Sequence, residues 1–257
     1  MKILVCGKGG SGKSTLATLL AVKLNHLGFT ILLIDADESN FGLHRLAGIS
    51  LPEDIMNNLG GKKGFKEKLN RKFPLDDKPF SQKIGIDELP EECVTETNGI
   101  KLLVIGKIHD FGEGCACPMG VLSKLVLSNL VMKDNEIAIV DTEAGIEHFG
   151  RRVDAECDLI LNVVDPTYES FMMAEKIQEM AQKASIDLFL VLNKINDRVE
   201  DSMIKNVNSE KIIARIPQNE QIFLESLEGK PLTAELPAME PICELIQELK
   251  RKSATSQ

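Results

Sequence analysis

Residues 2–14 read KILVCGKGGSGKS, an apolar run that leads into a glycine-rich loop and ends in Lys13 and Ser14. The loop matches the pattern G-x-x-x-x-G-K-[ST], and residues 15–27 after it are predicted to be helical. Between a strand and a helix, glycines let successive backbone N–H groups approach an anion, and the helix N-terminus adds favourable electrostatics. The stretch therefore predicts a site for nucleotide phosphates after the first strand of an α/β fold.

The loop residues have separate expected roles. Lys13 should bring positive charge to the β and γ phosphates, and the hydroxyl of Ser14 should ligate Mg²⁺. The other loop residues that we expect to contact the nucleotide are Gly7, Lys8, Gly9, Gly10, Ser11, Gly12 and Thr15.

Short apolar runs alternate with helical stretches along the chain, which is the pattern of a parallel sheet with helices on both faces. The runs are nearly continuous in Val, Ile and Leu, as expected for strands that are covered on both faces. We predict a doubly wound α/β fold of the P-loop NTPase type, with a mostly parallel sheet of about seven strands flanked by helices. The predicted strands are residues 3–6, 30–34, 101–105, 137–140, 159–164, 188–192 and 212–216.

Residues 51–98 interrupt this alternation with several glycines and prolines and a lysine-rich segment at 62–72. They show no strong strand pattern. Because fewer than about fifty residues make a weak core alone, we expect a helical or irregular excursion within a single domain of residues 1–257. The lysine-rich segment is expected to be a solvated face, with partner docking as the alternative.

The composition, 43% hydrophobic and 27% charged over 257 residues, is typical of a folded globular chain. Its net charge of -9 argues against coating DNA or an anionic membrane, so we expect neither as a partner. No apolar run reaches the length of about 18 residues that a membrane span needs, and we expect a cytoplasmic protein without a signal peptide. An amphipathic helix over 241–252 should dock on the domain, and residues 253–257 should fray.

Carboxylates follow two predicted strands, at the edge where ligands of open α/β folds bind. Asp35 and Asp37 come after the run ILLI, and Asp141 begins Asp-Thr-Glu-Ala-Gly after the run IAIV. Gly145, at the end of that segment, could offer a backbone N–H that senses a γ phosphate. Each aspartate could alternatively cap a following helix.

Cys115 and Cys117 lie in the segment FGEGCACPMG, before a helix predicted over residues 121–132. Two thiols at i and i+2 can face one ion, but Zn²⁺ and Ni²⁺ prefer four ligands, which a dimer axis through the loop would supply from two chains. Thiolates suit Ni²⁺, Zn²⁺ or an iron–sulfur cluster about equally, and ordinary loop residues or a redox dithiol are the alternatives. Residues expected to lie at the surface or in the core without a ligand are His109, His148, Cys6, Cys93, Cys157 and Cys243.

The second lysine at the entrance of GKGGSGKS resembles the deviant Walker A family, which includes MinD, ParA and the nitrogenase iron protein. In that family the entrance lysine reaches the partner's nucleotide across a homodimer, so the resemblance implies this role for Lys8 and two ATP molecules between protomers. It also implies that Asp37 positions the attacking water, and that Asp35 and Asp141 hold magnesium-bound water. We therefore expect an ATPase with Lys8, Lys13 and Asp37 as catalytic residues.

Asn193 and Lys194 end the run VLNK and resemble the base-recognition corner of the same ATPases. Residue 196 is asparagine, and an aspartate there would accept the two donors of guanine that adenine lacks, so its absence favours ATP over GTP. We expect Asn193 to contact adenine, with Lys194 in the nucleotide site. A strand-ending turn is the alternative for Asn193.

Nearly the whole chain resembles the CooC-type ATPases and their AcsF branch. The features that match are GKGGSGKS, Asp35-Ala-Asp37, Cys115-x-Cys117 and the run DTEAGIEH at 141–148, although Ser11 and Ser14 replace the valine and threonine of many relatives. The resemblance implies an ATP-dependent homodimer that inserts nickel into carbon monoxide dehydrogenase or acetyl-CoA synthase, with Ni²⁺ or Zn²⁺ on an intersubunit Cys-x-Cys site.

Two other functions remain open for this sequence. One is an iron–sulfur carrier or reductase of the Mrp or nitrogenase iron-protein type, although those relatives place their cysteines differently. The other is a positioning ATPase like MinD or ParA, against which the net charge of -9 and the acidic final helix argue.

Overall fold

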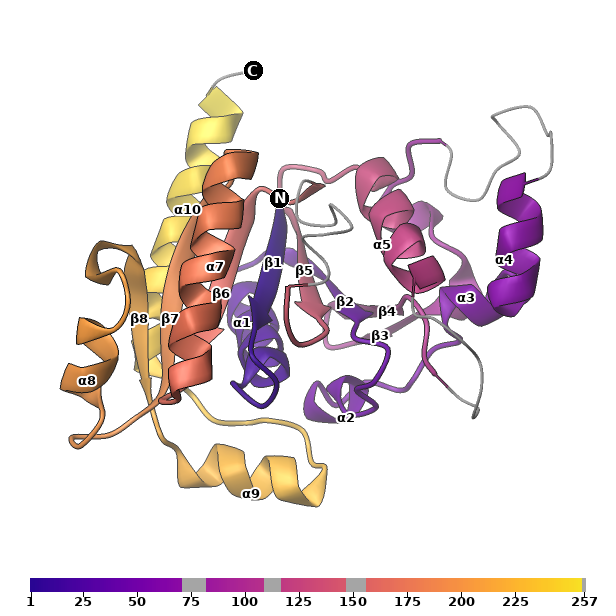
Figure 1. Cartoon of the computed structure of the whole chain (residues 1–257). Helices are drawn as coiled ribbons and strands as arrows, with labels where there is room; N and C mark the ends of the chain where they lie inside the picture. The colour runs from indigo at the N-terminus through magenta and orange to yellow at the C-terminus, as the bar shows by residue number, and fades with distance from the viewer. Residues whose placement is uncertain (71–81, 109–116, 147–155, 256–257) are drawn as a thin grey trace.

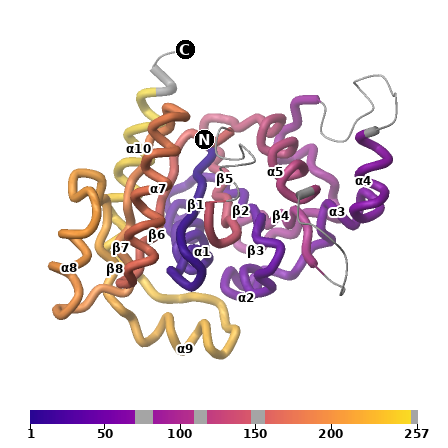
Figure 2. Tube along the Cα trace, viewed as in Figure 1, coloured from indigo at the N-terminus to yellow at the C-terminus, as the bar shows by residue number. Residues whose placement is uncertain are grey.

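The computed structural model describes residues 1–70, 82–108, 117–146 and 156–255 (Figures 1 and 2). Within these ranges an eight-stranded sheet has the order β3-β4-β2-β5-β1-β6-β7-β8, in which β3 and β4 pair antiparallel and the other neighbours pair parallel. The predicted doubly wound, mostly parallel α/β fold is confirmed. The strands are β1 Lys2–Gly7, β2 Thr30–Ala36, β3 Val94–Thr97, β4 Ile100–Val104, β5 Glu136–Thr142, β6 Leu159–Val164, β7 Asp187–Ile195 and β8 Ile212–Pro217.

The strand β3 corrects the expectation that residues 51–98 lack a strand. Thr97 pairs with Ile100, so Asn98 and Gly99 form a two-residue hairpin turn between β3 and β4. Their φ angles are 52° and 80°, in the left-handed region that asparagine and glycine tolerate best. The sequence signal was this Asn-Gly pair. The strand itself, VTET, is a short and half-polar edge strand that makes no apolar run.

Helices cover both faces of the sheet (Figure 1). In β1, Ile3 and Val5 belong to the hydrophobic cluster that includes α1 and α10, whereas Leu4 and Cys6 belong to the cluster that includes α5 and α7. This division follows from the period of two in a strand. The helices are α1 Lys13–His26, α2 Leu43–Leu46, α3 Ile55–Asn58, α4 Gly61–Asn70, α5 Cys117–Asn129, α7 Tyr168–Ala184, α8 Glu200–Lys205, α9 Glu220–Glu228 and α10 Glu240–Thr255.

The C-terminal helix α10 packs on the sheet, as predicted. Ile242, Cys243 and Ile246 are at most 2% exposed, so its apolar face is covered by the domain. The helix is longer than expected: residues 253–255 are helical rather than frayed, since Lys252 in the last turn favours the C-terminal end of the helix dipole, and residues 256–257 lie outside the described ranges. Across those ranges, no helix has both the length and the apolar character of a membrane span.

The helix α5 starts earlier than predicted, at Cys117 rather than at residue 121. Pro118 is compatible with this start, because the first helical turn does not require its N–H. The expectation that both cysteines precede the helix is therefore wrong for Cys117, which is the first helical residue.

The topology places the phosphate loop at a switch point. β1 lies between β5 and β6. From β1 the chain crosses to β2 in one direction, and from β6 it continues to β7 and β8 in the other. Ligands of open α/β folds bind at the carboxyl end of the strand where this direction changes, and residues 7–12 lie there.

Candidate functional site

The phosphate loop has a backbone that two of its glycines make possible. Gly7 and Gly12 have φ angles of 143° and 105°. A Cβ atom at Gly7 would lie 2.4 Å from the carbonyl oxygen of Val163, and one at Gly12 would lie 2.3 Å from the amide nitrogen of Asn193. A side chain at Gly7 would clash with fixed backbone, whereas one at Gly12 would displace the Asn193 amide, and the positive φ angle disfavours a side chain at both positions.

Lys13 lies at the start of α1 with only 7% of its surface exposed. Its ammonium group donates to the carbonyl oxygen of Lys8, at 3.3 Å, so it lies across the loop. Gly145 also contacts the loop, because its N–H donates to the carbonyl oxygen of Gly7 at 3.3 Å. A ligand in the loop would thus be close to the segment that follows β5.

A cleft of about 580 Å³ opens beside the loop. Its walls come from residues that are distant in sequence: the start of α1, the segment after β2, the end of β7 and the segment that joins β8 to α9. The cleft-lining residues that the sequence predicted are Gly9, Gly10, Gly12, Lys13, Ser14, Thr15, Asp37, Asn193 and Lys194. A further wall was not predicted, because its residues form no motif: Pro217, Asn219, Ile222 and Phe223.

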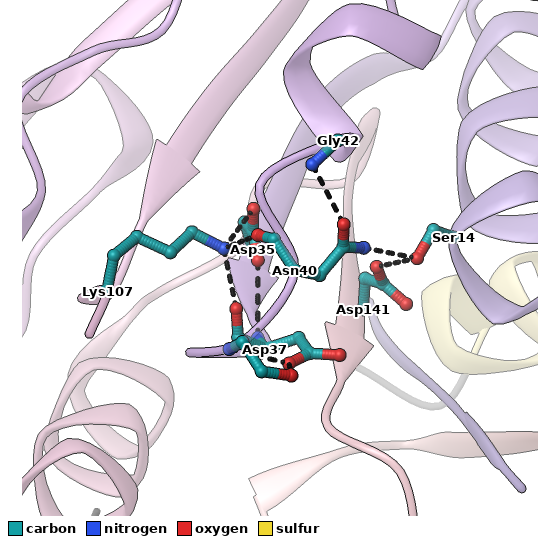
Figure 3. A network of polar contacts seen from close by, with 8 residues as sticks. Ser14, Asp35, Asp37, Asn40, Gly42, Lys107 and Asp141 are labelled. Atoms are coloured by element: carbon teal, nitrogen blue, oxygen red, sulfur yellow. Dashed lines mark hydrogen bonds and ion pairs between the residues drawn. The ribbon is translucent and has the colours of Figure 1, made fainter. Parts of the chain in front are cut away.

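Ser14, Asn40 and Asp141 form a hydrogen-bonded chain at the carboxyl ends of β2 and β5 (Figure 3). The Ser14 hydroxyl donates to Oδ2 of Asp141 at 2.6 Å and accepts from Nδ2 of Asn40 at 2.8 Å. Asn40 also accepts from the N–H of Gly42 through Oδ1, at 2.8 Å. Asn40 was not predicted, and no part of the sequence pattern points to it.

Asp141 is fully buried, and its Oδ1 atom has no hydrogen-bond partner within the described residues. Burial raises its pKa to about 7, and the nearby charge of Asp35 adds to the effect, while the Ser14 hydrogen bond and Lys13 oppose it. An unpaired carboxylate oxygen beside a hydroxyl is a suitable acceptor for a water ligand of a hard cation. These residues thus fit the expected Mg²⁺ site.

Asp35 lies in a tighter arrangement than the sequence predicted. Its Oδ2 forms an ion pair with the ammonium group of Lys107 at 2.7 Å, and its Oδ1 accepts from the N–H of Asp37 at 3.2 Å. Both charged side chains are 3% exposed. Burial raises the pKa of Asp35 to about 6, against the opposing effect of Lys107. Lys107 was not recognised from sequence, because a lysine after a strand has no distinctive pattern.

Asp37 lines the cleft and is held by its own loop. Its Oδ1 accepts from the backbone N–H of Ser39 at 2.9 Å and from the hydroxyl of Ser39 at 2.7 Å. These bonds orient the carboxylate. The predicted role of Asp37 in positioning water requires such an orientation.

Lys8 has a partner that was not predicted from the sequence. Its ammonium group lies 3.6 Å from Oδ2 of Asp165, and 29% of the Lys8 side chain is exposed. Asp165 follows β6 directly and accepts through Oδ1 from the hydroxyl of Thr167 at 2.8 Å. Asp35 was predicted because it directly follows an apolar run. Asp165 also directly follows an apolar run, so the same pattern could have identified it.

Asn193 and Lys194 both contact the phosphate loop from β7. The amide of Asn193 donates to the carbonyl oxygen of Ser11 at 2.7 Å, and the ammonium group of Lys194 donates to that of Gly10 at 2.6 Å. Lys194 has a φ angle of 58°, so the end of the strand turns towards the loop. Asn193 also lines the cleft, and its contact with adenine stays a prediction.

The predicted metal site lies largely outside the described residues. This holds for Cys115, His109 and His148, and the side chain of Cys117 is likewise not described. Among the described residues, no group of three or more His, Cys, Asp or Glu side chains could hold a metal ion. The other four cysteines are buried and form no disulfide: Cys6, Cys93, Cys157 and Cys243. Burial raises the pKa of Cys93 and Cys243 to about 11, which makes them poor thiolate ligands.

The family of the chain follows from comparison with known proteins. The model of the CobQ/CobB/MinD/ParA nucleotide binding domain matches residues 2–232. The chain belongs to this family. The matched residues include the glycine loop and the carboxylates at the ends of β2 and β5.

Two relatives are similar over most of their length. An uncharacterised ATP-binding protein of Methanocaldococcus jannaschii is 49% identical over 96% of this chain and 99% of its own. The carbon monoxide dehydrogenase accessory protein CooC of Rhodospirillum rubrum is 34% identical over 79% of this chain and 78% of its own.

Solved structures of this family share the fold. The cell division ATPase MinD of Pyrococcus furiosus superposes with a TM-score of 0.63 at 18% identity, over 96% of this chain and 98% of its own. The Mg-ADP complex of MinD from Pyrococcus horikoshii has a TM-score of 0.62 at 18% identity, over 90% of this chain and 86% of its own. At this identity the similarity concerns the fold alone.

Proposed function

We propose that this protein is a cytoplasmic, ATP-hydrolysing metallochaperone that inserts nickel into carbon monoxide dehydrogenase or acetyl-CoA synthase. The observation that carries the proposal is the combination of the phosphate loop and its adjoining cleft with the Cys115-x-Cys117 motif, whose second cysteine begins α5. The 34% identity to a carbon monoxide dehydrogenase accessory protein supports the same client.

In this proposal different residues of the cleft have separate roles in ATP hydrolysis. Lys13 and the loop N–H groups bind the phosphates, and Asp37, oriented by Ser39, positions the attacking water. Mg²⁺, when bound, would supply positive charge to the β and γ phosphates. Ser14 would ligate it, and Asp141 with Asp35 would accept hydrogen bonds from its water ligands.

Lys8 has its proposed role in a homodimer. Its ion pair with Asp165 is long and partly exposed, so little free energy is needed to exchange Asp165 for a phosphate of the partner's nucleotide. ATP binding would close the dimer through this exchange, and hydrolysis would reopen it. Two copies of Cys115 and Cys117 would then supply four thiolates to the cargo ion.

The packing of α10 bears on the positioning-ATPase alternative. The apolar side chains Ile242 and Ile246 are fully buried against the sheet, so this helix face is not available to a lipid surface. The iron–sulfur alternative is tested by reconstitution with iron and sulfide: a stable cluster absorbance, together with no response of nickel binding to ATP, would favour it.

A titration with Ni²⁺ and Zn²⁺ tests the proposal. We expect wild type to bind one ion per dimer in the presence of ATP, and Cys115→Ala/Cys117→Ala to lose this binding. Cys157→Ala is the matched control, because Cys157 is a buried cysteine outside the Cys-x-Cys motif. Unchanged metal stoichiometry in the double variant, with oligomeric state followed in parallel, would refute the metal site.

A further inference from the structure

Lys107 is a buried lysine, and its polar contacts within the described part of the chain go to one short segment, residues 35–40. Its ammonium group pairs with the Asp35 carboxylate at 2.7 Å, donates to the carbonyl oxygen of Asp37 at 2.5 Å and also donates to that of Asn40. An ammonium group has three donors, and these three acceptors use all of them. Figure 3 shows the three acceptors around the end of the Lys107 side chain.

The backbone around Lys107 follows the same segment. The N–H of Ile105 donates to the carbonyl oxygen of Asp35 at 3.0 Å, and the N–H of Ile108 donates to that of Glu38 at 3.2 Å. Residues 105–108 therefore continue beside residues 35–38 beyond the end of β4. The two segments are joined both by their backbones and by one buried side chain.

The segment that Lys107 holds, residues 35–40, carries groups of the candidate site. Asp37 lines the cleft, and Asn40 donates to the Ser14 hydroxyl at 2.8 Å. Lys107 fixes the carbonyl oxygens of these same two residues. Without the contacts of the Lys107 ammonium group, the side chains of Asp37 and Asn40 could shift. The phosphate loop would keep its place, because the acceptors of Lys107 lie outside it.

Residues 105–108 also contact α3 and α5, the helix that begins at Cys117. The N–H of Met56 in α3 donates to the carbonyl oxygen of Ile105 at 3.0 Å. A Cβ atom at Gly106 would lie 3.6 Å from the side chain of Met119, which is two residues beyond Cys117 in α5. A displacement of residues 105–108 would thus also displace the start of α5.

We propose that Lys107 is a positioning residue that holds residues 37–40 against Ser14 and passes their movement to the segment leading into α5. The first half concerns the nucleotide site, and the second half rests on the proposed metallochaperone function. ATP at the loop would move residues 37–40, and Lys107 would require residues 105–108 to follow. The binding of nucleotide would thereby change the position of the start of α5, where Cys117 lies.

The test uses Lys107→Met, Lys107→Arg and the matched control Lys101→Met. Lys101 also lies in this part of the chain, in β4, and forms an ion pair of 2.7 Å with Asp87, away from the cleft. Hydrogen exchange of the nucleotide-free proteins comes first. We expect the amides of Ile108 and Gly42 to exchange at least about tenfold faster in Lys107→Met and to be unchanged in the control.

Steady-state kinetics give the second readout. Lys107→Met should lower kcat by about tenfold or more and change KM for ATP by less than about threefold, because the phosphate loop keeps its contacts. Lys107→Arg retains the charge, but its planar guanidinium cannot reproduce the three contacts, so kcat should stay reduced. This variant also carries the test if Lys107→Met fails to fold.

Exchange and kcat within about twofold of wild type in both variants would overturn the positioning role, as would an arginine variant that equals wild type. In wild type, a non-hydrolysable ATP analogue should change Ni²⁺ affinity, and this response should be lost in Lys107→Arg. A retained response would overturn the coupling. If wild type neither hydrolyses ATP nor binds nickel, the proposed function fails, whereas the exchange comparison still decides the role of Lys107.

Discussion

The two sides of the candidate site differ in how firmly they are held. On the β2–β5 side, Ser14, Asn40 and Asp141 are joined by hydrogen bonds of 2.6 to 2.8 Å, and the Lys107 side chain is 3% exposed. On the β6 side, the ion pair of Lys8 with Asp165 measures 3.6 Å, and the Lys8 side chain is 29% exposed.

This difference suggests two kinds of residue in one site. The groups proposed to orient water and a cation are held in the ligand-free structure, which removes a cost of ordering them during the reaction. In the proposed homodimer, Lys8 would exchange Asp165 for a phosphate of the partner's nucleotide, and a weak contact with Asp165 suits this role. The contrast can be tested through the free energy of unfolding of the ligand-free protein.

Asp141→Asn should have the largest effect, an increase of about 2 kcal/mol in the free energy of unfolding at pH 8 without Mg²⁺. The folded-state pKa of Asp141 is raised to about 7, so wild type incurs the full cost of a buried charge only above that pH. The cost declines as pH falls and disappears near pH 4, where the carboxyl is protonated in the unfolded chain as well. The gain in the variant should follow the same course.

Chemical denaturation at several pH values in EDTA measures this effect. Asp187→Asn is the control, because Asp187 is exposed at the start of β7. A gain in Asp141→Asn that grows towards acid pH would contradict the assignment of a raised pKa.

Asn40→Ala should lower the free energy of unfolding by about 1 kcal/mol, since it removes the hydrogen bonds to Ser14 and Gly42. The exposed Asn135, whose amide donates to the Thr30 hydroxyl at 3.3 Å, provides the control Asn135→Ala with a smaller expected loss. Equal losses in the two variants, by urea denaturation, would show that the Asn40 contacts are no firmer than surface contacts.

Lys8→Met should have the smallest effect on stability, less than about 0.5 kcal/mol, because a long and partly exposed ion pair contributes little. Its rate of ATP hydrolysis should nevertheless fall by about a hundredfold or more, as for loss of a transition-state cation. Lys23→Met removes another partly exposed ion pair, with Glu240, and should leave the rate unchanged. A normal rate in Lys8→Met would refute the cross-dimer role.

Much of the fold could be predicted from local patterns. Seven of the eight strands show as apolar runs, because parallel strands buried on both faces need Val, Ile and Leu throughout. The exception, β3, is a four-residue edge strand that relies on pairing with β4 and shows only an Asn-Gly turn.

The sequence by itself determined the phosphate loop and the strand ends that carry Asp35, Asp37 and Asp141, since each depends on residues within a few positions of one another. Only the tertiary structure decided that Lys107 closes on Asp35, that Lys8 faces Asp165 and that Asn193 holds Ser11. The members of these pairs are separated by 72 to 182 residues in the sequence, and their contact depends on strand order and register. The partner of a single lysine or asparagine cannot be predicted from its neighbours in the sequence. It depends on which groups are buried beside that residue in the folded chain.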